Sequence, residues 1–178
     1  MEGSSEDEMM RAARLAQTIV FTSQGTPFMF AGEEIFRDKK GIHNTYNRPD
    51  SVNAIDWTLK NKNAEQFNYY CELTKLRKAH PAFRMTTAEA IAKHIVFDKV
   101  EGDNLISYSI KDNANGDEWK EIKLVFNGST EVREVKIKKG EWTIIAQDGQ
   151  LKADGMGTTK GGKMTIAPTS ALILARVK

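Results

Sequence analysis

The sequence predicts a mainly β protein, in which an antiparallel β-sandwich follows helices and one strand. Three observations lead to this fold class. Residues 1–82 hold two helical patterns separated by one short apolar run. Residues 83–178 hold seven short β-rich runs, with Gly, Asn, Asp and Pro between them at fairly even spacing. The character of the chain changes near residue 82, so we expect two domains, residues 1–82 and 83–178.

The first helix is predicted from Ser5 to about Thr22. Apolar residues recur there at steps of three and four, which places them on one helical face. Ser5 followed by Glu8 fits a capping box, in which each side chain bonds the other residue's backbone N–H. The apolar residues are Met9, Ala12, Ala13, Ala16, Ile19 and Val20.

A short apolar run, Pro27–Ala31, is predicted as a buried strand. Gly25 and Gly32 frame it, and Glu33 and Glu34 follow. Neighbouring side chains on an extended segment point to opposite sides, so the two carboxylates are not expected to act as a catalytic pair. We expect Glu34 to be a structural acid that bonds backbone or an arginine.

A polar loop, Arg37–Trp57, comes next. It is too long for an idle connection in a compact domain, and loops of this length are often functional. A second helix is predicted over roughly Asn63–Lys78, closed by Pro81. Its predicted inward residues are Phe67, Tyr70, Cys71, Thr74 and Leu76.

The second half supplies the predicted sandwich. Lys136, Lys138 and Lys139 alternate with apolar residues and are predicted to form the solvated face of a strand. Trp142 is expected to be a core anchor, and the glycine-rich stretch 154–162 a flexible hairpin connection. The seven runs are residues 94–100, 104–110, 121–127, 132–138, 141–146, 162–167 and 170–177.

Composition excludes several functions. The 26 Lys and Arg residues nearly balance 24 Asp and Glu, so electrostatics gives no reason to expect nucleic acid or a membrane as partner. The acidic, polar start is not that of a signal peptide. Cys71 is the single cysteine and is expected to be a small buried hydrophobe. No two of the three histidines have metal-ligand spacing, so we expect no metal and no cofactor.

One motif resembles a known family. Gly25, Pro27, Gly32 and Glu34 form G-x-P-x-x-x-x-G-x-E, which resembles the motif around the eighth barrel strand of the α-amylase superfamily. The sequence from Gly32 to Trp57 is similar to the segment after that strand in type I pullulanases, members of glycoside hydrolase family 13. It has an acidic pair, an Arg, a Lys, an Asn-x-Tyr and a Pro-Asp-x-x-Asn-x-x-Asp-Trp in the same order.

Two further segments extend the resemblance. Residues 73–84 resemble the end of the last barrel helix, and the β-rich half matches the family's C-terminal sandwich in position and size. The resemblance implies that residues 1–82 are the C-terminal remnant of a catalytic TIM (β/α)8 barrel. It also implies a parent enzyme that hydrolyses α-1,6 linkages in pullulan, amylopectin or glycogen with retention.

The family's catalytic carboxylates follow the fourth, fifth and seventh barrel strands, and their motifs are absent from this sequence. The resemblance therefore implies that the chain contains no catalytic residue and is inactive alone. It implies sugar contacts in the polar loop, where Asp50 matches the family's carboxylate and Asn44, Tyr46 and Asn53 are its neighbours. The alternative for Asp50 is a turn carboxylate after Pro49. Some relatives carry an Arg where this chain has Ala54.

Two roles are open for the β-rich half. It stabilises the barrel, or it is a module that itself binds α-glucan; the sparse aromatic residues after residue 84 favour the first role. An isoamylase or a glycogen-debranching enzyme is the alternative parent. The helices of a severed barrel would either dock on the sandwich or cause self-association through exposed apolar surface.

Overall fold

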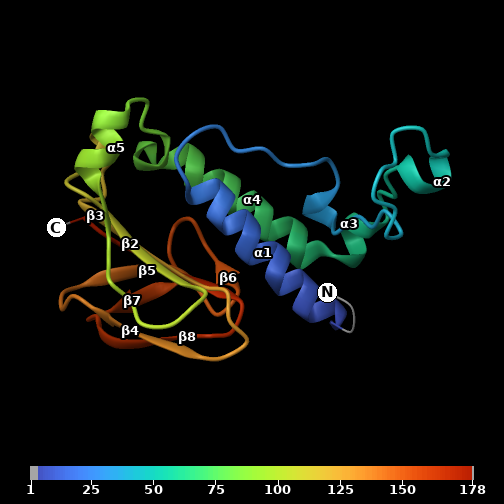
Figure 1. Cartoon of the computed structure of the whole chain (residues 1–178). Coiled ribbons are helices and arrows are strands. Elements are labelled where there is room, and N and C mark those ends of the chain that lie inside the picture. The colour runs from blue at the N-terminus through green and yellow to red at the C-terminus, as the bar shows by residue number, and fades with distance from the viewer. Residues whose placement is uncertain (1–3, 178) are drawn as a thin grey trace.

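The computed structural model describes residues 4–177, in which two long helices lie across one face of a β-sheet (Figure 1). The helices are α1 (Glu6–Thr22) and α4 (Ala64–Ala79), and they lie side by side. A second, smaller sheet packs on the other face of the main sheet. The described residues therefore form three layers: helices, a large sheet and a small sheet.

The prediction for α1 is confirmed. Ser5 is the N-cap, its backbone N–H donates to Glu8 Oε2 at 2.7 Å, and the Glu8 N–H donates to Ser5 Oγ at 3.2 Å. Such a box satisfies N–H groups that have no partner within the helix. Glu6, Asp7 and Glu8 lie in the first turn, where the positive end of the helix dipole favours acidic residues.

The position of α4 agrees with the prediction to within one residue at each end, but its predicted inward face is wrong in part. Cys71 and Thr74 are exposed. The buried face is rotated, because α4 packs on α1 and on the sheet through a neighbouring stripe of the helix. The buried residues of α4 are Gln66, Tyr69, Tyr70, Leu73, Leu76 and Arg77.

The predicted strand at Pro27–Ala31 is not formed. Residues 26–30 have no regular secondary structure, and Phe28 is 81% exposed. A strand needs a neighbour to pair its backbone groups, and none of residues 4–177 pairs with this run. Gly25 and Gly32 flank it with φ values of +91° and +97°, which turn the chain at both ends.

The remaining helices are short. One of them, α5 (Ala88–His94), has Thr87 as its N-cap and was not predicted from the sequence. The others are η1 (Glu33–Ile35), α2 (Asp50–Asn53), α3 (Leu59–Lys62), η2 (Pro81–Arg84) and η3 (Ala114–Gly116).

All seven predicted β runs contain strands. Two strands, β6 and β7, were not predicted; both pair with β5, so the glycine-rich stretch 154–162 is in part a strand and not only a connection. The bounds are β1 (Ile95–Phe97), β2 (Leu105–Lys111), β3 (Glu121–Asn127), β4 (Arg133–Ile137), β5 (Trp142–Gln147), β6 (Gln150–Leu151), β7 (Gly157–Thr159), β8 (Gly162–Ile166) and β9 (Ser170–Arg176).

The strands form two antiparallel sheets. The large sheet has the order β1-β2-β3-β9-β5-β6, with β7 also paired to β5, and the small sheet consists of β4 and β8. In the centre of the large sheet, β3 pairs over its whole length with both β2 and β9. The fold is therefore mainly antiparallel β, with helices covering one face of the large sheet.

The main core is continuous between the helices and the large sheet. Leu73 of α4 and Phe83 of η2 belong to the same buried cluster as Leu124 of β3 and Ile173 of β9. A second cluster lies between the two sheets and contains Trp142, which is a core residue as predicted. The predicted boundary between residues 82 and 83 falls inside η2, with main-core residues on both sides.

Candidate functional site

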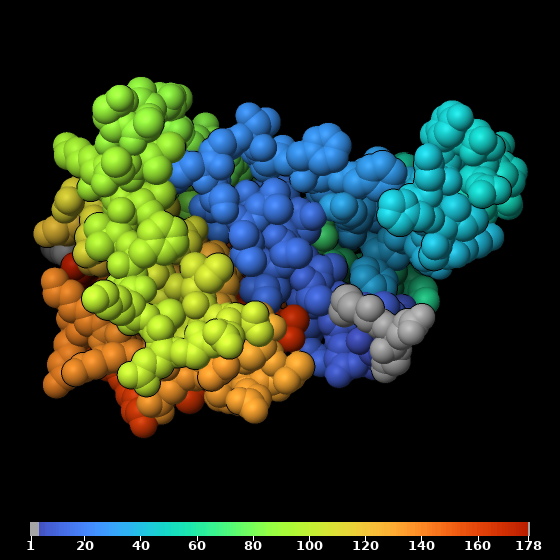
Figure 2. Space-filling view, in the orientation of Figure 1, coloured from blue at the N-terminus to red at the C-terminus, as the bar shows by residue number. Residues whose placement is uncertain are grey.

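The polar loop, residues 37–57, stands away from the two long helices (cyan in Figure 2). Asn53 organises it. The Asn53 amide nitrogen donates to the carbonyls of Thr45 at 2.7 Å and Arg48 at 2.8 Å, and its amide oxygen accepts from Lys39 Nζ at 2.9 Å. One side chain thus closes the loop on itself and fixes the conformation of residues 45–53.

Arg37 and Lys39 tie the start of the loop to its end. The Arg37 guanidinium donates to the carbonyl oxygens of Asn53 and Ala31, and Lys39 also donates to the Thr45 hydroxyl at 3.0 Å. Arg37 packs against Gly32, where an added Cβ would lie 2.6 Å from Arg37 Cδ. The glycine is therefore required both by this contact and by its positive φ.

The predicted sugar-contact residues occupy two different environments. Asp50, Asn44 and Tyr46 are exposed, and the Tyr46 side chain is 85% accessible. Asp50 is the first residue of α2, and Asn44 accepts a hydrogen bond from the Tyr46 N–H at 3.3 Å. Asn53, in contrast, uses its amide group for hydrogen bonds within the loop. The four side chains share one loop, but only the first three are open to a ligand.

The motif residues Gly25, Pro27, Gly32 and Glu34 surround the apolar run. The Glu34 carboxylate accepts from the Gly32 N–H at 2.9 Å, a structural contact with backbone. Glu33 accepts from Gln17 of α1 at 2.6 Å, and burial raises the pKa of the Glu33 carboxyl above its usual value. The two neighbouring carboxylates thus have different partners.

Arg77 anchors the start of this region to α4. Its guanidinium donates to the carbonyls of Phe21 at 2.7 Å, Ser23 at 2.8 Å and Gly25 at 2.5 Å. Burial lowers the pKa of Arg77, which nevertheless stays charged at neutral pH. The residue caps the C-terminal end of α1 and fixes where the apolar run begins.

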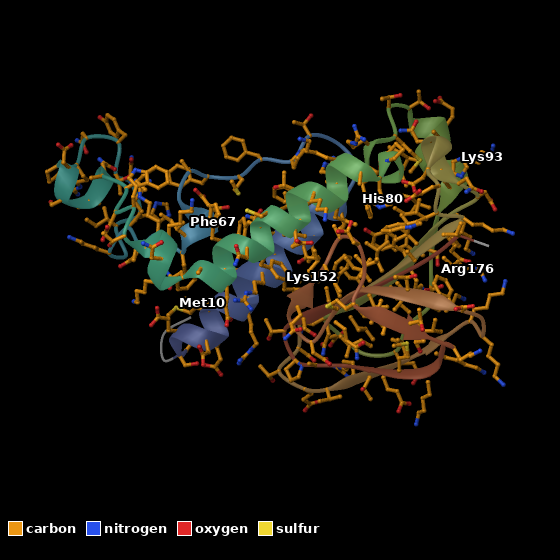
Figure 3. All side chains as sticks on the ribbon, turned by 180° about the vertical axis from the view of Figure 1, so that it is seen from behind. Met10, Phe67, His80, Lys93, Lys152 and Arg176 are labelled. Carbon is orange, nitrogen blue, oxygen red and sulfur yellow. The ribbon has the colours of Figure 1, made fainter. Side chains whose placement is uncertain are left out.

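An apolar groove lies between the apolar run and α4, with a volume of about 700 Å³. Phe67, Cys71 and Thr74, which the sequence predicted to point into the core, line this groove instead. The helical spacing of these residues therefore marks the face of α4 that lines the groove, and not the face that is buried in the core. Figure 3 shows Phe67 near the start of α4 and His80 at its far end.

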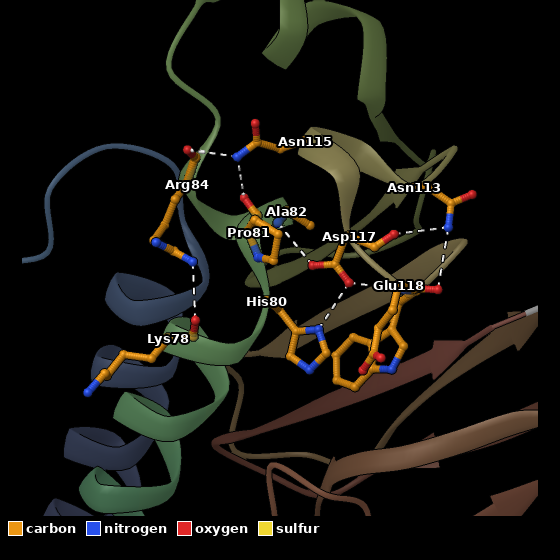
Figure 4. Close-up of polar contacts among 10 residues, drawn as sticks. Lys78, His80, Pro81, Ala82, Arg84, Asn113, Asn115, Asp117 and Glu118 are labelled. Carbon is orange, nitrogen blue, oxygen red and sulfur yellow. Dashed lines mark hydrogen bonds and ion pairs between the residues drawn. The ribbon is translucent and has the colours of Figure 1, made fainter.

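A buried polar junction joins α4 to the β strands (Figure 4). His80 Nδ1 lies 3.0 Å from Asp117 Oδ1, and the His80 ring stacks on Trp119 with 3.3 Å between ring centroids. Asp117 also accepts from the backbone N–H groups of Ala82 at 3.0 Å and Trp119 at 2.9 Å. Burial would raise the pKa of Asp117, but these hydrogen bonds outweigh it and lower the pKa. No local feature of the sequence indicates this pairing of His80 with Asp117.

Neither a metal-ligand group nor a membrane-spanning helix is found within residues 4–177. No three His, Cys, Asp or Glu residues gather there in a group that could hold a metal ion. None of the helices described is both long and apolar enough to cross a membrane.

Known proteins match both the sequence and the fold. The family model "Pullulanase, all-beta domain" matches residues 91–150. A pullulanase from Bacillus subtilis strain 168 is 40% identical over 116 residues, which cover 65% of this chain and 16% of that protein. An isoamylase from Flavobacterium sp is 34% identical over 83 residues, which cover 47% of this chain and 11% of the isoamylase.

Solved structures match over almost the whole chain. The pullulanase from Bacillus acidopullulyticus has a TM-score of 0.92 at 36% identity, over 98% of this chain and 21% of that chain. A Bacillus subtilis type I pullulanase complexed with maltose has a TM-score of 0.88 at 28% identity, over 99% of this chain and 24% of that chain. The chain thus spans about a quarter of these proteins or less.

The fold and the matches define a class first: the chain corresponds to a portion of a debranching glycoside hydrolase. Its counterpart within that class is the C-terminal portion of a type I pullulanase, because the pullulanase matches cover 97% of the chain or more in structure. The isoamylase match covers under half of the chain, so the alternative parent explains less of it.

Proposed function

We propose that this chain is the C-terminal part of a pullulanase that hydrolyses α-1,6-glucosidic linkages in pullulan, amylopectin or glycogen. The observation that carries the proposal is the structural match to the Bacillus acidopullulyticus pullulanase, which includes the helices as well as the sheets. A match limited to the β strands would have been compatible with many parents. The chain alone lacks the catalytic carboxylates that the family uses, so we propose that it is inactive by itself.

We further propose that residues 1–82 are the end of a (β/α)8 barrel and residues 83–178 the domain that follows it. Three features of the first part support this proposal. Phe28 and Phe30 are exposed in a run without strand partners, the groove on α4 is apolar, and the motif glycines turn the chain at both ends of the run. These are the surfaces that a barrel strand and its helix would bury against neighbouring strands.

For the polar loop we propose that Asp50, Asn44 and Tyr46 contact α-glucan in the complete enzyme, while Asn53 positions them. Exposure of the first three side chains and the closed hydrogen-bond set of Asn53 support this division. Sugar sites combine a planar aromatic face with fixed donors and acceptors, and the loop holds both. Known pullulanases complexed with maltose and maltotriose make an α-glucan the ligand to test.

For the β strands we propose a stabilising role and not an independent glucan site. Of the five aromatic residues between 85 and 177, only Phe97 is exposed. The other four are buried, and Tyr108, Trp119 and Phe126 belong to the core that is shared with α1 and α4. A glucan-binding surface would need several exposed aromatic rings on one sheet face, and residues 85–177 do not offer them.

A chimaera tests the proposed activity. Residues 4–178 of this chain replace the matching C-terminal region of the Bacillus acidopullulyticus pullulanase, and release of reducing sugar from pullulan is measured. We expect activity from the chimaera and none from this chain alone. A soluble, folded chimaera without activity, or cleavage of pullulan by the chain alone, would overturn the proposal.

The same chimaera tests the loop. We expect Asp50→Asn to lower kcat/KM on pullulan at least about tenfold with an unchanged melting temperature, because the exposed carboxylate forms no hydrogen bond or ion pair within residues 4–177. Asp103→Asn, an exposed carboxylate in the β strands' connecting loops, serves as the matched control. Equal activity of the two variants would make Asp50 a turn residue only.

A further inference from the structure

A second cleft lies in the β region, away from the polar loop. Its floor is formed by β2 and β3, and β4 stands over one side of it. The cleft has a volume of about 940 Å³. The small sheet packs on the large sheet through an inter-sheet core that includes Val125, Leu172 and Trp142. Ser109 of β2 and Lys123 of β3 line the cleft beside this core.

The floor of the cleft is polar although it is buried. Ser109 of β2 lies opposite Lys123 of β3, and both residues are less than a tenth exposed. The Lys123 ammonium pairs with Asp98, which also accepts from the Ser107 hydroxyl at 2.7 Å. An ammonium has three donors, and Asp98 is the one acceptor that Lys123 has within residues 4–177. Burial lowers the pKa of Lys123 to about 8.

The lining carries an excess of positive charge. Six lysines and three carboxylates line the cleft. Each carboxylate already has a cationic partner within residues 4–177: Asp98 has Lys123, Glu134 has Lys163 at 2.7 Å, and Glu121 has Arg176. Four lysines are left without a carboxylate inside 4 Å in that part of the chain. They are Lys111, Lys136, Lys138 and Lys139.

We propose that this cleft binds a phosphorylated sugar, with the phosphate held by Lys136 and Lys138 of β4 and its neighbouring loop and the sugar hydroxyls facing Ser109 and Lys123. Lysine ammonium groups bind phosphate oxygens by charge-assisted hydrogen bonds. The hydroxyl of the buried Ser109 and the donors of the Lys123 ammonium that Asp98 does not use match a ligand that is rich in hydroxyl oxygens.

The size of the cleft favours a phosphorylated sugar over free phosphate. A volume of about 940 Å³ far exceeds that of one oxyanion and lies in the range of small-molecule sites, roughly 300–1,000 Å³. The site would bind independently of the chemistry proposed above, because none of its lining residues belongs to the apolar run or the polar loop.

Titration of the complete 178-residue chain tests this inference. Glucose 6-phosphate, inorganic phosphate and glucose are each added at low ionic strength, and backbone amide NMR shifts are followed. We expect saturable shifts on β2, β3 and β4 with glucose 6-phosphate, weaker binding of phosphate, and no shift on these strands with glucose. The double variant Lys136→Ala/Lys138→Ala should weaken binding about tenfold or more, since two charge-assisted contacts are lost.

Lys152→Ala is the matched control, because Lys152 is an exposed lysine beside α4 (Figure 3) and outside the cleft. It should leave the affinity unchanged. Both lysines of the double variant are exposed, so the fold should persist, and far-UV circular dichroism verifies this. Equal affinity for phosphate and glucose 6-phosphate, equal affinity in the double variant, or shifts confined to other surfaces would overturn the assignment.

Discussion

The aromatic residues of the β region and those of residues 25–57 lie in opposite environments. In the β region four of the five aromatic side chains are buried, and Trp142 is 1% exposed. Between residues 25 and 57 the chain exposes Phe28, Phe30, Tyr46 and Trp57. The contrast extends to the backbone, because the strands of the β region pair with one another, whereas residues 26–30 have no strand partner within residues 4–177.

This difference separates the β strands, which stabilise the chain, from the apolar run and the polar loop, which expose aromatic surface. The β strands satisfy their own backbone groups and bury their apolar faces against the helices and the small sheet. The apolar run and the polar loop hold their shape through Arg37, Asn53 and Arg77, but leave aromatic surface open. Exposed apolar surface of this kind marks an interaction site, and we propose that the rest of the barrel and glucan are what it contacts.

The largest expected effect compares two phenylalanines. Phe83 is fully buried in the main core, while Phe28 is 81% exposed. Phe83→Ala should lower the free energy of unfolding by about 3–5 kcal/mol, because it removes core contacts and leaves a cavity. Phe28→Ala should change it by no more than about 0.5 kcal/mol. Urea unfolding measures both, and similar losses would erase the contrast between the two regions.

A smaller loss is expected at Arg77. Arg77→Met keeps much of the volume but leaves the carbonyls of Phe21, Ser23 and Gly25 without their donor. We expect a loss of about 2–3 kcal/mol in the free energy of unfolding. Lys78→Met, one position further on an exposed face of α4, is the control and should be nearly neutral. Equal effects of the two would mean that these hydrogen bonds do not fix the start of the apolar run.

Asp117 gives the junction a pH dependence. Because its folded pKa lies below the usual value near 4, its contribution to stability is complete above about pH 4 and is lost as the pH falls through the folded pKa. Asp117→Asn should cost about 1–3 kcal/mol at pH 7 and should flatten the decline of stability below pH 4. Thermal unfolding between pH 2 and 7 measures this. If the variant loses stability below pH 4 as steeply as the wild type, Asp117 does not cause this pH dependence.

The smallest effect on stability, but a clear one on assembly, is expected from Phe28→Asp. The exposed apolar run and the groove on α4 should cause the isolated chain to self-associate at high concentration. A charge at position 28 should return it to the monomer without changing the melting temperature. Sedimentation equilibrium distinguishes the monomer from the self-associated chain. A wild-type chain that stays monomeric at all concentrations would contradict the prediction.

Local patterns predicted the two long helices and the seven β-rich runs, but not α5, β6 or β7. The capping box at Ser5 and Glu8 and the seven β-rich runs are signals carried by neighbouring residues, and the structure has an element at each. The run at Pro27–Ala31 has the same composition as a buried strand, yet it forms none. A strand depends on partners elsewhere in space, and composition cannot say whether those partners are present.

Contacts between distant residues could not be predicted. His80 and Asp117 are 37 positions apart, and neither has a local feature that points to the other. The prediction that Cys71 and Thr74 point into the core was wrong, because periodicity does not tell which of two neighbouring helix faces is covered. In the polar loop the sugar contacts of Asp50, Asn44 and Tyr46 stay a prediction. The closed hydrogen-bond set of Asn53 became visible only in three dimensions.

Amide hydrogen exchange, compared between the isolated chain and the pullulanase chimaera, tests the central claim most directly. The account predicts that β3 and β9 are protected in both proteins, because their partners lie within this chain. Residues 26–31 should exchange fast in the isolated chain and become protected in the chimaera, where neighbouring barrel strands are available. Fast exchange of residues 26–31 in an active, folded chimaera would contradict the claim that this run is the edge of an incomplete barrel.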